Sequence, residues 1–81
     1  MKIENVKAVI TGAGSGLGEG TARYLKDRGA ELLLIDLNAE GLKKVAKETD
    51  AKYFVGDVSN EEEMKKAIED FDGINCLVNC A

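Results

Sequence analysis

A glycine-rich stretch at residues 11–18, with the sequence TGAGSGLG, is the part of this chain best suited to chemistry. An apolar segment with Val6, Ala8, Val9 and Ile10 precedes it, and a segment of helical character follows it. A chain that passes from a strand into a helix within a few residues needs a tight turn, and glycine tolerates positive φ values best. The helix N-terminus then presents unpaired N–H groups and the positive end of its dipole, which favour an anion. The stretch therefore predicts a phosphate-binding turn.

The glycines of this turn are spaced so that a pyrophosphate can approach bare backbone. Gly12, Gly16 and Gly18 follow the pattern Gly-x-x-x-Gly-x-Gly, and a side chain on that turn would block the approach. Thr11 and Ser15 add hydroxyl groups that can fix the turn or touch the ligand. The pattern differs from the G-x-G-x-x-G fingerprint, because no glycine stands where the last one of that fingerprint belongs.

An acidic residue, Asp36, closes the next apolar segment, residues 31–35. A carboxylate at this place can accept hydrogen bonds from both hydroxyls of an adenosine ribose. It also repels a 2′-phosphate, and no Lys or Arg lies in the turn or beside Asp36 to offset that repulsion. These features predict a dinucleotide site that prefers NAD to NADP. The alternative is a flexible loop followed by a solvated aspartate.

Two other nucleotide-binding loops fit less well. A P-loop ends in Gly-Lys-Ser/Thr, whereas this stretch continues as Gly18-Glu19-Gly20, whose carboxylate would repel phosphates. A methyltransferase loop usually follows an acid at the end of the first strand, and Ile10-Thr11 supplies none. Both alternatives are therefore disfavoured.

Composition narrows the kind of partner and the compartment. The 81 residues carry 11 basic and 15 acidic side chains, a net charge of −4, which argues against a nucleic acid or a membrane surface. No apolar run could span a membrane, and Met1 begins no signal-peptide pattern.

On a strand, Cys76 and Cys80 would lie about 13 Å apart, too far for a disulfide. With no histidine in the chain, we expect a metal-free protein of the reducing cytoplasm.

Hydrophobic periodicity divides the chain into strands and helices in alternation. The expected strands are residues 6–11, 31–35, 52–55 and 76–79. The expected helices are residues 16–28, residues 39–49 and a third that begins with a capping box of Ser59 and Glu62. The third helix is expected to bury Met64, Ala67, Ile68 and Phe71. This order predicts an α/β fold in which residues 1–81 form a single domain around a parallel sheet with right-handed crossovers.

Further residues follow the third and fourth strands, at the edge where open α/β sheets bind their ligands. Asp57 could accept a hydrogen bond from an adenine amino group, and Val58 could form an apolar wall beside the ring. Asn79 ends the fourth strand. An equally good interpretation is that Asp57 only begins a turn and that Asn79 only terminates a strand.

Together these motifs resemble those of the short-chain dehydrogenase/reductase family. The turn is similar to the family's cofactor loop, Asp36 to the acid of its NAD-preferring members, and Asp57-Val58 to its adenine-contacting pair. Residues 78–81 resemble its Asn-Asn-Ala-Gly motif, with Cys80 in place of the second Asn; Ser-Gly-Leu-Gly and Asn-Cys-Ala also resemble type 2 3-hydroxyacyl-CoA dehydrogenases. The resemblance implies a Rossmann-like sheet of strand order 3-2-1-4. It implies cofactor contacts from Gly12, Ser15, Gly16, Leu17, Gly18, Asp36, Leu37, Asp57, Val58, Asn79 and Ala81.

The resemblance covers the whole chain, but family members continue to a catalytic Ser and a Tyr-x-x-x-Lys pair. Tyr24 is followed four residues later by Arg28, and Tyr53 by Asp57, so neither supplies that pair. We therefore expect the NAD(H)-binding N-terminal portion of an oxidoreductase, truncated after the fourth strand and without hydride transfer of its own. The alternatives are a non-catalytic dinucleotide-binding module and a structural half that assembles without cofactor.

A sheet that stops at residues 76–79 leaves that strand as an edge. Ile74, Leu77, Val78 and the first strand are then expected to expose apolar surface. An unpaired apolar edge invites pairing with another chain. This predicts a homo-oligomer, or association with a missing C-terminal half, through the fourth strand.

Overall fold

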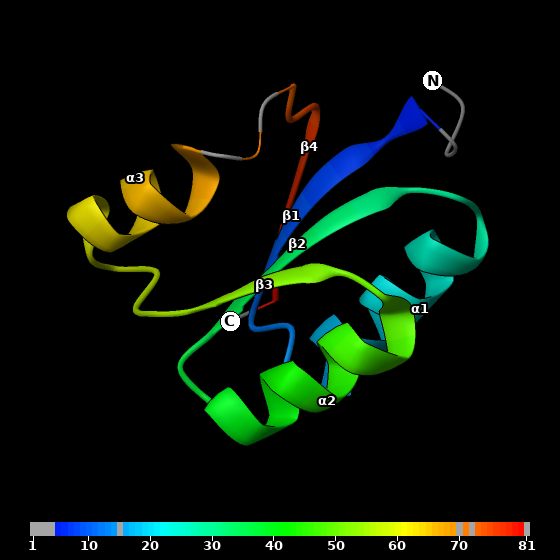
Figure 1. Ribbon diagram of the computed structural model, residues 1–81, viewed down its shortest axis with the longest axis horizontal. Coiled ribbons are helices and arrows are strands. Elements are labelled where there is room, and N and C mark those ends of the chain that lie inside the picture. The colour runs from blue at the N-terminus through cyan, green and yellow to red at the C-terminus, as the bar shows by residue number, and fades with distance from the viewer. Residues whose placement is uncertain (1–4, 15, 70, 72, 81) are drawn as a thin grey trace.

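The computed structural model describes residues 5–14, 16–69, 71 and 73–80 of the chain (Figure 1). In these residues strands and helices alternate as the hydrophobic pattern predicts. The strands are β1 Lys7–Thr11, β2 Glu31–Asp36, β3 Lys52–Val55 and β4 Cys76–Asn79. The helices are α1 Gly16–Asp27, α2 Ala39–Thr49 and α3 Glu61–Glu69. The expected bounds of the strands and of the first two helices are correct to within a residue.

The strands form one parallel sheet in the order β3-β2-β1-β4 (Figure 1). On the inner strand β1, Ile10 is level with Leu34 of β2 and Val78 of β4. The order confirms the predicted Rossmann-like α/β fold. Because all strands run in one direction, their carboxyl ends meet at one edge, and the loops that follow them come together there.

Alternating strand side chains build a separate core on each face of the sheet, with α1 and α2 on one face and α3 on the other (Figure 1). The strand residues packed toward α1 and α2 include Ala8, Ile10, Leu32 and Leu34. Those packed on the α3 side, with Ala67 and Phe71, are Val9, Leu33 and Ile35. Both faces of β1 and β2 are therefore covered, which is why their sequences are almost continuously apolar.

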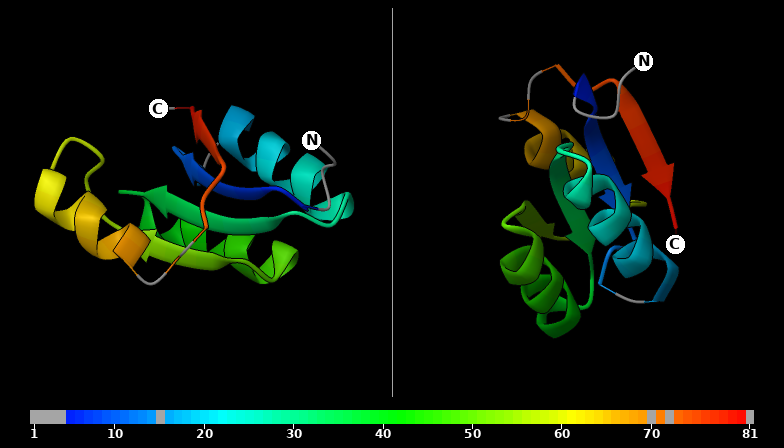
Figure 2. Two further views of the ribbon diagram at one scale, coloured as in Figure 1. Left: turned by 90° about the horizontal axis from the view of Figure 1, so that it is seen from above. Right: turned by 90° about the vertical axis from the view of Figure 1, so that its right-hand side faces the viewer.

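β4 forms an open border of the sheet (Figure 2). Leu77 on this border is 68% exposed and Ile74 before it is 36% exposed, as expected, whereas Val78 is partly buried. The expected exposure of the first strand is wrong, because residues 8–10 are at most 2% exposed. They are flanked by β2 and β4, and their side chains belong to the two cores, so of the residues expected to be open only Leu77 and Ile74 are exposed.

The start of α3 differs from the expected capping box. Asn60 caps the helix, and its Oδ1 accepts a hydrogen bond from the backbone N–H of Glu63 at 3.1 Å. Ser59 instead donates its backbone N–H and its hydroxyl to Asp57 Oδ1, at 2.8 and 2.7 Å. The predicted box of Ser59 and Glu62 is therefore wrong, because the Asp57 carboxylate holds Ser59 in the preceding turn.

The buried face of α3 is narrower than expected. Ala67 is buried and Met64 is partly buried, but Ile68 is 37% exposed. Phe71 is buried as expected but lies after the helix, which ends at Glu69. Successive helical residues are rotated by about 100°, so a residue next to Ala67 projects beside the contact with the sheet. The expected burial of Ile68 is therefore wrong.

Gly20, in α1, offers a stabilising substitution. A Cβ built on it meets nothing within 4 Å. Because glycine inside a helix costs about 0.5–1 kcal/mol relative to alanine, Gly20→Ala is expected to raise the free energy of unfolding by about that amount. Urea denaturation measures the change, and a lower free energy of unfolding would contradict the open surroundings of Gly20.

Candidate functional site

The loops after β1, β2 and β3 enclose a small pocket at the carboxyl edge of the sheet. Its volume is about 80 Å³. It is lined by Gly12, Asp36, Leu37, Gly56, Asp57 and Val58. All of these except Gly56 are residues that the sequence predicts to contact a cofactor. The fold thus joins the glycine turn, the acid after β2 and the Asp-Val pair after β3 in one place.

The glycine turn enters α1 through left-handed backbone. Gly12 has a φ of 68° and Gly16 a φ of 30°, values that strain a residue with a side chain. A Cβ on Gly16 would project into open space, so the backbone there is approachable from outside. The N–H of Ala13 donates to the carbonyl of Ile35 at 3.3 Å and ties the turn to β2. Ser15, also predicted to contact the cofactor, lies outside the described residues.

Close packing requires a glycine at position 18, in addition to the predicted need for a phosphate to approach the backbone. Gly18 is buried, and a Cβ there would lie 2.7 Å from the carbonyl carbon of Gly12 and 2.8 Å from the Cα of Ala13. Both neighbours are backbone atoms, which cannot rotate away as a side chain would. Gly18 therefore allows the first turn of α1 to pack directly against the glycine turn.

Asp36 lies half-buried at the pocket, and both of its carboxylate oxygens accept hydrogen bonds. Oδ2 accepts from the backbone N–H of Gly14 at 2.8 Å, and Oδ1 accepts from the backbone N–H of Asn38 at 3.1 Å. An ionised carboxylate has about four lone-pair sites, so it retains acceptor capacity toward the pocket. Gly14 was not among the predicted site residues, although a further glycine inside the turn is a signal for a close backbone approach.

Asp57 begins the turn into α3, as one interpretation holds, and it also lines the pocket. Its backbone N–H donates to Glu63 Oε2 at 2.9 Å. The Ser59 hydroxyl and then the Ser59 N–H donate to its carboxylate and hold the pKa of Asp57 below its usual value. The carboxylate is therefore charged at neutral pH. Val58 beside it is 37% exposed and, with Leu37, supplies the apolar part of the lining.

Gly56 is the lining residue that was not predicted from the sequence. It is buried, and its backbone N–H donates to the carbonyl of Asp36 at 3.1 Å. A Cβ there would lie 3.0 Å from Cδ1 of the Phe54 ring. The feature of the sequence that could have identified Gly56 is its position directly before the Asp-Val pair.

Asn79 lies outside this pocket and beside Thr11. The Thr11 hydroxyl donates to Asn79 Oδ1 at 2.9 Å, and the N–H of Cys80 donates to the Thr11 carbonyl at 3.1 Å. Thr11 therefore joins the ends of β1 and β4. Asn79 lines a second pocket of about 190 Å³ together with Thr11, Val58, Met64 and Leu77. Val58 is common to both pockets, and Ala81 lies outside the described residues.

Leu17 also lies outside the first pocket. It is 76% exposed in the first turn of α1. With Gly16 it lines a wider, mostly apolar depression of about 490 Å³ between α1 and β4, whose other lining residues are Gly20, Thr21, Tyr24, Leu25, Cys76 and Val78. The structure therefore places Leu17 and Asn79 away from the pocket that contains Asp36.

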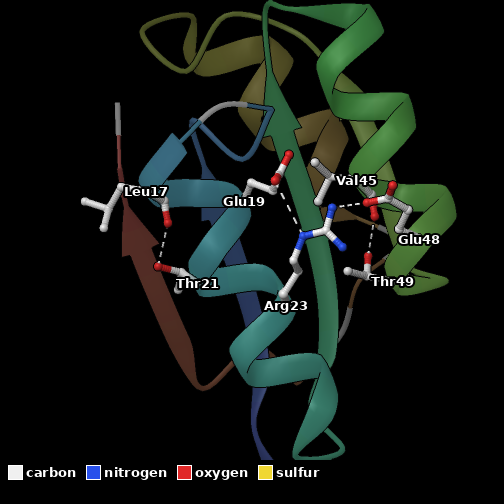
Figure 3. A network of polar contacts seen from close by, with 7 residues as sticks. All are labelled: Leu17, Glu19, Thr21, Arg23, Val45, Glu48 and Thr49. Atoms are coloured by element: carbon white, nitrogen blue, oxygen red, sulfur yellow. Dashed lines mark hydrogen bonds and ion pairs between the residues drawn. The ribbon is translucent and has the colours of Figure 1, made fainter.

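A polar network connects α1 to α2 (Figure 3). Arg23 of α1 forms an ion pair with Glu19, one turn earlier, with Nε and Oε2 3.5 Å apart. Its guanidinium also pairs with the Glu48 carboxylate of α2. These side chains are 34–41% exposed, and surface ion pairs contribute only about 0–1 kcal/mol. The network therefore links α1 to α2 and adds little stability.

Three further observations bear on partners. Cys76 and Cys80 are free thiols. Within the described residues, no group of three or more His, Cys, Asp or Glu side chains could hold a metal ion. In the same part of the chain no helix is long and apolar enough to cross a membrane.

A parallel sheet of order 3-2-1-4, with a glycine turn after its first strand and an acid after the next, defines a Rossmann-like fold of the dinucleotide-binding class. Residues 6–81 match the family model described as short chain dehydrogenase. The chain therefore belongs to the short-chain dehydrogenase family, as its motifs predict.

Relatives and solved structures agree with this assignment. An uncharacterized oxidoreductase of Staphylococcus epidermidis is 40% identical over 86 residues, which cover 99% of this chain and 37% of the relative. A short chain dehydrogenase from Bacillus anthracis has a TM-score of 0.90 at 27% identity, covering 100% of this chain and 36% of that one. A 3-ketoacyl-(acyl-carrier-protein) reductase from Brucella melitensis was solved in complex with NADH. It has a TM-score of 0.81 at 32% identity, and the match covers 93% of this chain and 34% of the reductase. The chain thus spans about a third of the length of these proteins.

Proposed function

We propose that residues 1–81 are a single NAD(H)-binding domain, the N-terminal portion of a short-chain dehydrogenase-type oxidoreductase. The observation that carries the proposal is the pocket in which Asp36 stands between the glycine turn and the Asp57-Val58 pair. Ligands of open α/β sheets bind at this carboxyl edge. The NADH complex of the similar Brucella melitensis reductase supports a nicotinamide dinucleotide as the ligand.

In this proposal the pyrophosphate lies on the glycine turn, where the approach to Gly16 is open. The hydroxyls of the adenosine ribose donate to the remaining lone pairs of Asp36, and the adenine lies against Val58 with its amino group donating to Asp57. The negative charge of Asp36 repels the 2′-phosphate of NADP, which favours NAD. Ser15, Leu17, Leu37, Asn79 and Ala81 are proposed as further contacts of the extended cofactor.

The bound nicotinamide would supply hydride chemistry, and this chain's own residues bind and orient the cofactor. Tyr24 and Tyr53 lack the lysine four residues later that the family's catalytic tyrosine requires. We therefore propose that the chain binds NAD(H) without turning over a substrate by itself. The free thiols of Cys76 and Cys80 support a reducing compartment such as the cytoplasm.

Calorimetric titration of the chain with NAD and NADP tests this function. Saturable binding with NAD favoured is the expected result, whereas a folded chain that binds neither would overturn the proposal. Gly16→Val should abolish binding, because the side chain occupies the open approach to the turn. Gly20→Val controls for added bulk on α1, since Gly20 also has open space at its Cβ but stands one helical turn further from the N-terminus of the helix. Circular dichroism confirms that both variants fold, and NAD binding retained by Gly16→Val would place the pyrophosphate elsewhere.

A second role, assembly through β4, is favoured by the open border of the sheet. β4 pairs with β1, and no other strand of the described sheet lies beyond it. Leu77 and Ile74 add exposed apolar surface at this border. We propose that β4 associates with a second copy of the chain or with the C-terminal half of a longer protein. Sedimentation should show a dimer or a larger species, and a monomer at high concentration would exclude self-association.

A further inference from the structure

The glycine turn and the start of α2 approach each other backbone to backbone at Gly14 and Gly41. A Cβ on Gly41 would lie 2.7 Å from Asn38 Nδ2 and 3.2 Å from the carbonyl carbon of Gly14. A Cβ on Gly14 would lie 2.8 Å from Asp36 Oδ2 and 3.0 Å from the backbone nitrogen of Leu42. Neither position can carry a side chain without moving its neighbours, so the contact depends on two glycines that are far apart in the sequence.

This contact surrounds Asp36 with hydrogen-bond donors from both sides. Gly14 on the turn donates to Oδ2, and Asn38 donates to Oδ1. Asn38 is also the N-cap of α2, where its own Oδ1 accepts from the N–H of Gly41 at 3.3 Å and its carbonyl accepts from the N–H of Leu42 at 3.0 Å. The orientation of the carboxylate is therefore set jointly by the glycine turn and by the first turn of α2.

We infer that Gly41 is a positioning residue for cofactor selection, which clamps the Asp36 carboxylate between the glycine turn and the α2 cap. The inference rests on the proposed NAD(H) binding and deepens it. Gly41 does not line the pocket, so it acts through Gly14, Asn38 and Asp36. A carboxylate already held in place loses less conformational freedom when it binds two ribose hydroxyls, which strengthens binding. The same clamp keeps its charge where a 2′-phosphate would lie.

Gly41→Ala tests the clamp, with Gly20→Ala as its matched control. Both variants add one methyl group to a helical glycine, but only the methyl at position 41 meets the glycine turn, because the one at position 20 meets nothing within 4 Å. In Gly41→Ala the amide of Gly14 should exchange its hydrogen about tenfold faster, since its bond to Asp36 opens. NAD affinity should fall about tenfold and NADP affinity less, so that the preference narrows. Gly20→Ala should leave the exchange rate of the Gly14 amide, the NAD affinity and the NADP affinity unchanged.

The two readouts separate failure of the clamp from failure of the proposed function. Unchanged Gly14 exchange and an unchanged NAD-to-NADP preference in folded Gly41→Ala would overturn the inference. If the unaltered chain bound no dinucleotide, the proposed function would fail, and the role of Gly41 in selection would fail with it. The exchange measurement needs no cofactor, so it would still show whether Gly41 holds the turn.

A second variant covers the case in which Gly41→Ala does not fold. Gly14→Ala opens the same contact from the turn, because its methyl group would meet Asp36 Oδ2 and the Leu42 nitrogen. The readout is the amide of Asn38, which donates to the other oxygen of Asp36. Faster exchange of this amide together with a narrowed NAD preference supports the clamp. If the Asn38 amide still exchanges slowly and the preference for NAD over NADP is unchanged, the clamp is contradicted.

Discussion

Gly18→Ala is expected to destabilise the chain by about 3 kcal/mol, at the upper end of the usual cost of overpacking a core. The added Cβ would lie 2.7 Å from the carbonyl carbon of Gly12 and 2.8 Å from the Cα of Ala13. Relief requires a shift of α1 away from β1 or a distortion of the glycine turn, because backbone atoms have no rotamers. Urea denaturation followed by circular dichroism gives the change in the free energy of unfolding.

Gly20→Ala provides an internal comparison for Gly18→Ala. The two glycines belong to the same helix two residues apart, so the helix propensity gained on replacement by alanine is similar. Their surroundings differ, since a Cβ at position 20 meets nothing within 4 Å. The two variants should therefore move the free energy of unfolding in opposite directions. Equal stability of the two would show that α1 does not pack on the turn as the structure has it.

Asp36→Ala is expected to weaken NAD binding about 100-fold, because it removes two charge-assisted hydrogen bonds to the ribose. NADP binding should weaken less, since loss of the negative charge also removes the repulsion of the 2′-phosphate. The ratio of the two dissociation constants therefore moves toward one. Titration calorimetry with both cofactors measures the ratio directly.

Asp36→Asn separates the charge of this side chain from its role in the local structure. Asn keeps a carbonyl oxygen that can accept from Gly14 or Asn38, so it disturbs the glycine turn less than alanine does. If charge sets the preference, Asp36→Asn should narrow the NAD preference while keeping the stability of the chain. A full preference in both variants would show that selectivity lies in other residues.

The order of elements could be predicted because it depends on local patterns. Strand and helix bounds follow from apolar periodicity, and the parallel arrangement follows from alternation of strands and helices. The misses lie where two local patterns compete. Ser59 and Asn60 are both good helix caps, and the Asp57 side chain decides between them by holding Ser59. Ile68 fits the apolar stripe of α3, but Ala67 and Phe71 already fill the contact with the sheet.

Residues of the candidate site were predictable where the side chain of a single residue suggests its role. The acid after β2 and the Asp-Val pair after β3 are such cases, and the structure places Asp36, Asp57 and Val58 around the same pocket. Gly14 and Gly41 were not predictable as a pair, because nothing in their sequence spacing shows that a turn and a later helix start will touch. Likewise, the motif that contains Leu17 does not show that this residue lies outside the pocket.

The sequence by itself determined the α/β class, the glycine turn, the acid that follows β2 and the family, because each depends on residue type and on spacing along the chain. Only the tertiary structure decided which glycines serve packing, how Asp36 is oriented and which predicted residues share a pocket. The physical reason is distance: the Gly14–Gly41 contact and the Gly14–Asp36 hydrogen bond join segments that meet only after the sheet has aligned its strands. Steric limits and hydrogen bonds between such segments depend on their relative positions in space, which local periodicity does not specify.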